Sequence, residues 1–195
     1  MKLGFIGLGT MGAGMALNLR KAGHEMVVHD VRKASADPLI AAGATWADTV
    51  AEVGAKSDVV FTSVPGPKEM KQIGLDEGGL LDSMRPGTVW FDLSTNSPTV
   101  VREVYQRCKE KGITLFDAPV SGGPSGARSG KLAIYVGGDA DAFERYKSLL
   151  DTLGDQVMRV GDIGAGNSAK LVHNVASMTV RMMIAEALVP LGRIG

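Results

Sequence analysis

The sequence has few of the features that mark secreted, membrane or nucleic-acid-binding proteins. Cys108 is the only cysteine among 195 residues, which excludes an internal disulfide and leaves no cysteine spacing typical of a metal site. The 21 basic and 21 acidic residues balance, so the charge indicates neither a nucleic-acid partner nor an acidic membrane surface. No apolar run reaches the ~18 residues that span a bilayer, and no signal-peptide region precedes the first expected strand. We therefore expect a cytoplasmic protein that uses no metal ion.

Short β-type runs alternate with helical patterns along the chain, with no linker, repeat or low-complexity segment. This alternation predicts βαβ units and therefore an α/β fold with a Rossmann-like, doubly wound and mostly parallel sheet, followed by the start of a long helix. We expect strands at 2–7, 25–30, 58–63, 88–92, 113–117, 132–137 and 156–160, and helices at 10–22, 36–42, 47–55, 67–73, 98–111, 122–129, 140–152 and 165–191.

A glycine-rich turn lies between the first expected strand and helix. Gly7-Leu8-Gly9-Thr10-Met11-Gly12 is a G-x-G-x-x-G in the strand–turn–helix context of the dinucleotide fingerprint. Gly7 would make the tight turn, Gly9 would admit a pyrophosphate against the backbone, and Gly12 would let the helix lie close to the strand. The N–H groups and dipole at the helix N-terminus attract phosphate. We expect these six residues to bind the cofactor.

The second expected strand ends at an acidic residue, Asp30, which lies 18 residues after Gly12. A carboxylate at this point suits the ribose hydroxyls of NAD and repels the 2′-phosphate of NADP. The sequence therefore favours NAD over NADP. Arg32, two residues later, argues in the opposite direction.

Small and polar residues follow two strands that we expect at the centre of the sheet. Ligands of such sheets bind beyond the carboxyl ends of the strands. We therefore expect Val64, Pro65 and Thr95 to line the nicotinamide half of the cofactor site. A helix N-cap shared with Ser97 is the alternative role for Thr95.

Another glycine-bearing turn follows the strand that ends at Asp117. Ser121, Gly122 and Gly123 place a hydroxyl and consecutive small residues at a helix start. Such a turn can form a nest of N–H donors that fits a carboxylate. A structural turn built from glycine and proline is the alternative.

The last expected helix carries residues suited to acid–base chemistry. Its start contains three glycines between residues 161 and 166, which leave the backbone open to close approach by another molecule. Lys170 and Asn174 are one turn apart and project from the same face. A lysine held among protein groups can have its pKa lowered into the range of a general acid or base. For His173 we favour a packing role, with the rim of the site as the alternative.

Together these motifs resemble the three signatures of the β-hydroxyacid dehydrogenases, the group of 3-hydroxyisobutyrate dehydrogenase, tartronate semialdehyde reductase and 6-phosphogluconate dehydrogenase. The resemblance covers residues 7–12, 117–123 and 161–174 in the expected order. It implies a Rossmann-like N-terminal domain and Lys170 as the catalytic acid/base. It also implies that Ser121, Gly122, Gly123 and Asn174 bind the substrate, and that Thr95 lies near the nicotinamide.

A choice within this family follows from one position. The run from Lys170 to Asn174 is similar to that of the 6-phosphogluconate enzymes, which carry a glutamate seven residues after the lysine for decarboxylation. Ser177 occupies that position here. We therefore predict hydride transfer without decarboxylation. The reaction would interconvert a short 3-hydroxy acid, such as 3-hydroxyisobutyrate, and the corresponding semialdehyde, with NAD as the cofactor.

The resemblance also implies a division of the chain. Residues 1–162 would form the NAD(P)-binding domain, and residues 163–195 would begin the interdomain helix of an all-helical C-terminal domain that this chain lacks. That helix is apolar nearly all round, so we expect it to pack against a partner chain or a missing segment, in a homo-oligomer. The chain alone would then be weakly active or inactive.

Two other functions remain open on the same scaffold. One is an NAD(P)-binding module without catalytic turnover, and the other is an imine or semialdehyde reductase. The presence of Lys170 and Asn174 argues against both, because a sensor needs no acid/base and the imine reductases carry another residue in place of the lysine.

Overall fold

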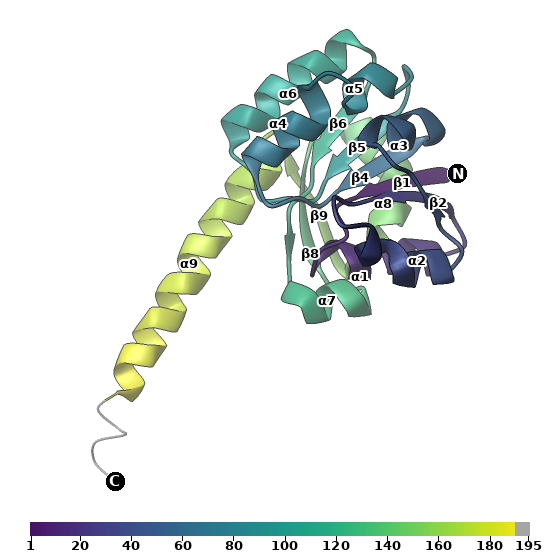
Figure 1. Ribbon diagram of the computed structural model, residues 1–195. Helices are drawn as coiled ribbons and strands as arrows, with labels where there is room; N and C mark the ends of the chain where they lie inside the picture. The colour runs from purple at the N-terminus through teal and green to yellow at the C-terminus, as the bar shows by residue number, and fades with distance from the viewer. Residues whose placement is uncertain (190–195) are drawn as a thin grey trace.

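The computed structural model describes residues 1–189, which form one sheet between two layers of helices and a long projecting helix (Figure 1). The strands are β1 (Lys2–Ile6), β2 (Glu25–His29), β3 (Thr45–Trp46), β4 (Val59–Thr62), β5 (Val89–Asp92), β6 (Thr114–Asp117), β7 (Val120–Ser121), β8 (Ala133–Gly137) and β9 (Gln156–Gly161). The helices are α1 (Gly12–Lys21), η1 (Lys33–Ala36), α2 (Asp37–Ala41), α3 (Val50–Lys56), α4 (Pro67–Leu75), α5 (Leu80–Ser83), α6 (Pro98–Glu110), α7 (Gly123–Ser129), α8 (Ala140–Asp151) and α9 (Ala165–Leu188).

The strand order is the one typical of dinucleotide-binding folds. Strands β3-β2-β1-β4-β5-β6 are neighbours in that order and all run parallel. The order reverses between β1 and β4, and ligands of such sheets bind in the crevice at this reversal. Beyond β6, β8 runs antiparallel to β6 and β7, whereas β9 pairs with β8 in parallel. The Rossmann-like fold expected from the sequence is confirmed.

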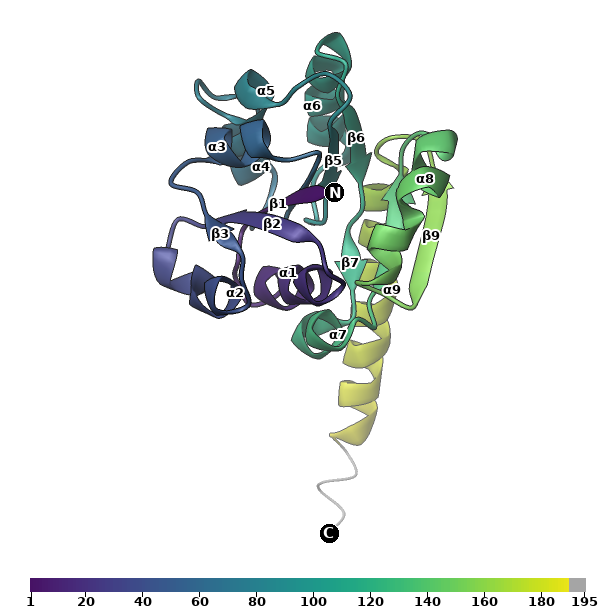
Figure 2. The same ribbon diagram turned by 90° about the vertical axis from the view of Figure 1, so that its right-hand side faces the viewer.

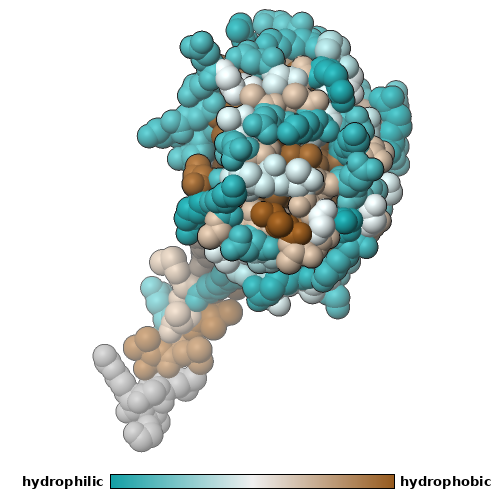
Figure 3. Space-filling model, turned by 45° about the vertical axis from the view of Figure 1, so that its right-hand side comes forward, coloured by the Kyte–Doolittle hydropathy of each residue, from teal (hydrophilic) through white to brown (hydrophobic). Residues whose placement is uncertain are grey.

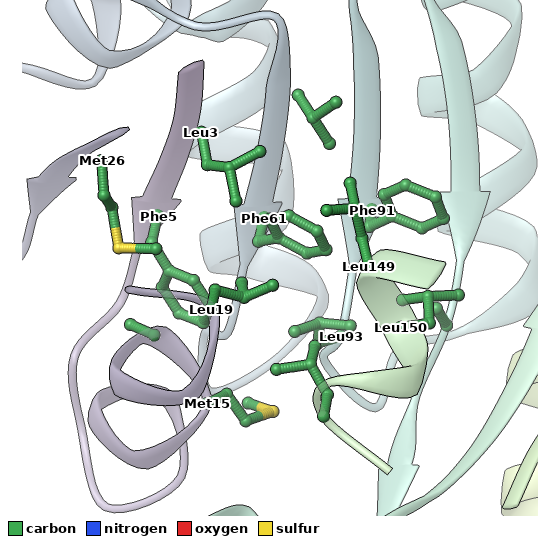
Figure 4. Packing of buried hydrophobic residues seen from close by; sticks show 14 of the residues in the cluster. Leu3, Phe5, Met15, Leu19, Met26, Phe61, Phe91, Leu93, Leu149 and Leu150 are labelled. Atoms are coloured by element: carbon green, nitrogen blue, oxygen red, sulfur yellow. The ribbon is translucent and has the colours of Figure 1, made fainter. Parts of the chain in front are cut away.

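Two apolar cores form because successive side chains of a strand point to opposite faces of the sheet. On one face, the rings of Phe5, Phe61, Phe91 and Phe116 follow one another across neighbouring strands, at centroid separations of 6.1, 5.3 and 4.6 Å. Helices α1, α2 and α8 pack against this face (Figure 2). Figure 4 shows Leu19 of α1 and Leu150 of α8 beside the strands. On the other face, Trp90 is fully buried beneath α3, α4, α5 and α6. Packing on both faces fixes the parallel strands, whose carboxyl ends lie together at one edge of the sheet.

The seven expected strands are all present, and the differences lie in short elements. Strands β3 and β7 and helix α5 were not expected, because two to four residues show no readable periodicity. Helix α3 begins at Val50 instead of residue 47, since the Thr49 hydroxyl accepts a hydrogen bond from Glu52 N–H and caps the helix there. Helix α9 ends at Leu188, and the last residues expected in it, 190 and 191, lie outside the described part.

Helix α9 begins against β6 and β8 and then extends away from the sheet (Figures 1 and 3). Of the helices among residues 1–189, none combines the length and the hydropathy of a membrane span. Cys108 lies fully buried in α6, and burial raises the pKa of its thiol to about 12. The exposed apolar side chains of α9 include Val172, Val175, Met178, Val180, Met182, Met183, Ile184 and Leu188.

Candidate active site

Two cavities open side by side along the carboxyl ends of the central strands. The first, which we call the glycine-loop cavity, has a volume of about 480 Å³ and lies over Gly7, Gly9 and Gly12. The second, the lysine cavity, has a volume of about 800 Å³ and contains Lys170 in its wall. The cavities are contiguous, because both are lined by Met11, Ser63, Val64 and Pro65.

The three fingerprint glycines are required for different geometric reasons. Gly7 has a φ of 90°, and a side chain there would collide with the carbonyl oxygen of Ser63. A side chain at Gly12 would collide with the carbonyl oxygen of Gly7, so α1 can lie against the turn only because Gly12 has none. Gly9 has open space above it, with no atom within 4 Å of a Cβ placed there. This space over a helix N-terminus fits a dinucleotide pyrophosphate.

The remaining fingerprint residues divide between the cavity and the core. Thr10 and Met11 line the glycine-loop cavity, but the Leu8 side chain is buried in the core and only its backbone faces the turn. The Leu8 N–H donates to Asp30 Oδ2 at 2.7 Å, and the Arg32 N–H donates to Asp30 Oδ1 at 2.8 Å. Asp30 therefore ties the end of β2 to the glycine turn and also lines the cavity, where its carboxylate oxygens retain lone pairs for ribose hydroxyls.

The loops after β4 and β5 meet in the lysine cavity. The Val64 N–H donates a hydrogen bond to Ser94 Oγ at 2.9 Å, which joins the two loops. Val64, Pro65 and Thr95 all line the cavity. The N-cap of α6 is Ser97, without a side-chain capping bond, so the alternative capping role for Thr95 is not seen.

The turn after β6 brings its small residues to the same cavity. Ser121, Gly122 and Gly123 line it, and the two glycines have φ values of 131° and 64°. These left-handed conformations favour glycine, so the turn cannot readily be built from other residues. The hydroxyl and the backbone of this turn therefore face Lys170 and Asn174 across one space.

Lys170 is 8% exposed and opens onto the lysine cavity. Burial lowers the pKa of its amine below the ordinary 10.5. Among residues 1–189, no carboxylate forms an ion pair with it. Asn174, one turn later, lines the same wall. The packing role that we favoured for His173 is wrong: this ring is exposed at the cavity rim, 5.8 Å from the ring of Tyr135.

The start of α9 is fixed by a carboxylate for which we had expected no role. Asp117, at the end of β6, accepts hydrogen bonds from Gly164 N–H and Asn167 N–H at 2.7 Å each. The Asn167 side-chain amide donates to it as well, at 3.3 Å. Burial raises the pKa of Asp117 to about 6, although these donors oppose the shift. Lys170 follows Asn167 by three residues, so Asp117 positions the first turns of the helix that carries it.

The glycines at the start of α9 serve the protein's own packing. A side chain at Gly166 would collide with the carbonyl oxygens of Asp117 and Tyr135, and one at Gly164 would lie 3.1 Å from the Arg102 guanidinium. Our expectation that these glycines admit another molecule is therefore wrong, because strands β6 and β8 occupy the space beside Gly166. Their bare backbone lets α9 begin directly on the sheet.

A buried polar network lies beneath the cavity floor. The Asn96 amide side chain donates to Asp92, and Thr62 Oγ1 donates to Asp92 Oδ1 at 2.8 Å. Burial raises the pKa of Asp92, which faces no cation. The network continues to Asn167, which accepts from Asn96 N–H. No local pattern predicts this network, because its partners lie far apart along the chain.

The lysine cavity extends along α9 beyond Asn174. Ser177, Met178 and Arg181 also line it. Ser177 and Arg181 were not expected as binding residues, although their spacing from Lys170 places them on its face of the helix. Among residues 1–189, no group of three or more His, Cys, Asp and Glu side chains could hold a metal ion.

Comparisons with known proteins agree with this geometry. The model of a family described as the NAD-binding domain of 6-phosphogluconate dehydrogenase matches residues 2–161. An NAD-dependent L-serine dehydrogenase of Pseudomonas aeruginosa is 39% identical over 96% of this chain and 63% of its own length. A 2-(hydroxymethyl)glutarate dehydrogenase of Eubacterium barkeri is also 39% identical, over 97% of this chain and 63% of its own.

A solved structure is similar over the whole chain. Mycobacterium tuberculosis 3-hydroxyisobutyrate dehydrogenase superposes with a TM-score of 0.93 at 35% identity, covering 100% of this chain and 66% of that one. The chain therefore spans less than two thirds of the length of the two dehydrogenases named above. The family model and the structural superposition both agree with a dinucleotide-binding fold.

Proposed function

Because the chain belongs to the β-hydroxyacid dehydrogenase family, an oxidoreductase family with an NAD-binding domain, we propose that it interconverts a short 3-hydroxy acid and the corresponding semialdehyde. Lys170 is the acid/base in this proposal, and NAD is preferred to NADP. The observation that carries the proposal is the lysine cavity, whose wall contains Lys170, Asn174 and residues 121–123 and which adjoins the glycine-loop cavity.

The residues that would hold NAD are those of the two joined cavities. The open space over Gly9 accommodates the pyrophosphate, Asp30 accepts from the adenosine ribose, and Val64, Pro65 and Thr95 line the nicotinamide half. The chemistry that bound NAD supplies is hydride exchange with the carbon that carries the hydroxyl group. All other steps belong to side chains and backbone of this chain.

The substrate is oriented from two sides. Its carboxylate binds at Ser121, Gly122 and Gly123, and Asn174 donates to or accepts from the hydroxyl group. In oxidation, the neutral amine of Lys170 takes the hydroxyl proton as the C–H bond gives up its hydride. In reduction, the ammonium of Lys170 returns that proton to the carbonyl oxygen. General acid–base catalysis of this kind is worth about 10²–10⁴ in rate.

The test is a cofactor-reduction assay with 3-hydroxyisobutyrate and a panel of short 3-hydroxy acids, with NAD and NADP side by side. The reverse direction uses semialdehydes and cyclic imines with the reduced cofactors. We expect turnover of the hydroxy acid and semialdehyde pair with NAD. Turnover of imines alone would assign the chain to imine reduction, and tight NAD binding without turnover of any compound would make it a binding module.

We also propose that the apolar side chains of α9 are buried against a second copy of the chain. Met182 and Ile184 are 65% and 55% exposed in the monomer, and such a face is seldom left in water. Sedimentation should therefore show a dimer or larger species. Ile184→Lys should lower the fraction of protein in this species and raise the fraction of monomer. Thr179→Lys, a control at an exposed polar position of the same helix, should lower the associated fraction less.

A further inference from the structure

One face of α9 carries a row of polar side chains that is longer than the proposed reaction requires. Lys170, Asn174, Ser177 and Arg181 follow one another at alternating spacings of four and three residues. Residues at these spacings lie on one side of a helix. All four line the lysine cavity. The proposed chemistry uses Lys170 and Asn174, and leaves Arg181 at the far end without a role.

The charges in the lysine cavity have one sign. Lys170 and Arg181 line it, His173 stands at its rim, and no Asp or Glu is among its described lining residues. The glycine-loop cavity differs, since Asp30 and Glu69 line it together with one arginine. A cavity lined by cations alone raises the local concentration of anions and favours those with more than one charge.

Arg181 has no carboxylate partner within the described part of the chain. Among residues 1–189, other arginines such as Arg85, Arg107 and Arg159 form ion pairs, and Arg181 does not. Glu186 is the only acidic residue of α9, and its spacing of five residues places it on a different side of the helix. The planar guanidinium of Arg181 is therefore available for bidentate contact with an anionic oxygen pair.

The position of Arg181 sets where such an anion would lie. Eleven residues separate it from Lys170, or about 16 Å along the helix axis. Long helical side chains point back towards the helix N-terminus, and this holds for Lys170 as well as Arg181, so the amine and the guanidinium are separated by a similar distance. An anion bound there would be several bonds away from the hydroxyl carbon. This anionic group would also be distinct from the substrate carboxylate that we propose to bind at residues 121–123.

We propose that Arg181 binds a second anionic group at the distal end of the substrate, so that the site selects 3-hydroxy acids with two negative groups over those with one. This inference rests on the proposed function and narrows its substrate class. The shared chemistry is a group with at least two anionic oxygens, which a carboxylate or a phosphonate supplies. Arg181 is a specificity-determining residue in this scheme, and proton transfer remains with Lys170.

The experiment uses the full chain and pairs of matched substrates. One series is 2-(hydroxymethyl) dicarboxylic acids with one to six methylene groups before the second carboxylate, because Lys170 and Arg181 are far apart along α9. Each is paired with the monocarboxylic acid that ends in a methyl group at the same length, and a further arm replaces the distal carboxylate with a phosphonate. The readout is kcat/KM for cofactor reduction, because it compares substrates by the transition-state contacts that they make.

The expected result is a preference for the doubly charged member at one chain length. Arg181→Gln should lower kcat/KM for that member by roughly 10- to 100-fold, as for loss of a charge-assisted bond, and should change the methyl-ended partner less than about threefold. Arg181→Lys should restore part of the preference, since it keeps the charge and loses the bidentate fork. Arg107→Gln, an exposed arginine of α6, is the control and should change neither.

Two outcomes overturn the proposal. One is a protein with no preference for the doubly charged member at any length. The other is an equal loss for both members in Arg181→Gln, which would mean that Arg181 pairs with another part of the protein. If no member of any pair is turned over, the proposed function fails. The role of Arg181 is then tested by calorimetry, which measures the binding of the same pairs to the NAD-loaded protein. Equal affinity for both members of every pair would reject that role.

Discussion

The backbone N–H of Asn96 donates a hydrogen bond of 2.5 Å to Oδ1 of Asn167, across 71 residues of sequence. Asn96 directly follows Thr95 in the loop after β5, and Asn167 precedes Lys170 by three residues in α9. The bond is fully buried. It therefore links the loop that lines the nicotinamide side of the cavity to the helix that carries the proposed acid/base.

Removal of this hydrogen bond should loosen the contact between the loop after β5 and helix α9. Asn167→Ala leaves the buried N–H of Asn96 without a partner, and we expect the free energy of unfolding to fall by about 1–3 kcal/mol. The value of kcat should fall more than NAD affinity, since the glycine turn is not involved. Chemical denaturation, NAD titration and turnover measure the three quantities, and an unchanged kcat in a folded variant would contradict the positioning role.

Lys170→Ala should lower turnover by about 10²–10⁴ and leave NAD binding nearly unchanged, because the amine acts on the proton of the substrate. Lys170→Arg keeps the charge but cannot deprotonate, so it should be similarly impaired in oxidation. Single-turnover kinetics and NAD titration check this. Full activity of either variant would remove Lys170 from the mechanism.

The pH dependence of the two reaction directions should be opposite. The pKa of Lys170 is lowered from 10.5 by burial. Oxidation requires the neutral amine, so its kcat/KM should rise with pH and level off below pH 10.5. Reduction requires the ammonium, so its kcat/KM should fall over the same range. Profiles of equal slope and sign in both directions would contradict a single acid/base.

The free energy of unfolding should depend on pH through the protonation of Asp117. Its pKa is about 6 in the fold against an ordinary 3.8, so between these values the folded state binds more protons than the unfolded state. This group alone then lowers the free energy of unfolding as pH rises from about 4 to about 6. Asp117→Asn should abolish that slope, as denaturation at several pH values measures. It should also destabilise the start of α9, because the amide cannot accept both N–H groups.

Gly9→Ala and Gly12→Ala should separate binding from folding. A Cβ at Gly9 meets no atom within 4 Å, so this variant should fold with unchanged stability but lose NAD affinity by at least about tenfold. A Cβ at Gly12 collides with the Gly7 carbonyl oxygen, so that variant should be destabilised. Gly66→Ala, where the nearest atom is 3.8 Å away, is the matched control and should retain both properties. Unaltered NAD affinity in Gly9→Ala would refute pyrophosphate contact at this residue.

Asp30→Asn should narrow the difference in affinity between NAD and NADP, which we expect to exceed tenfold in the native protein because an unpaired carboxylate facing a phosphate is unfavourable. The ratio of the two affinities is the appropriate readout, since Asp30 also accepts hydrogen bonds from Leu8 and Arg32 and its loss affects the turn for both cofactors. Equal titration curves for the native protein would reject the preference.

Local patterns in the sequence were sufficient for most of the fold. The fingerprint glycines, the seven main strands and the helices between them depend on neighbours within a few residues, through turn conformation and periodic burial. For the same reason Lys170 and Asn174 could be assigned to one face of a helix. Strands β3 and β7 were missed because their pairing depends on β2 and β8, which lie elsewhere in the chain.

The sequence by itself determined that this chain has a dinucleotide-type turn, an acidic residue after its second strand and a helix with a lysine and an asparagine one turn apart. The tertiary structure alone decided what surrounds them. Asp117 reaches Gly164 across 47 residues and Asn96 reaches Asn167 across 71, and Arg181 faces the lysine cavity only because α9 begins on β6 and β8. Such contacts follow from how the elements pack together, and no local spacing of residues specifies them.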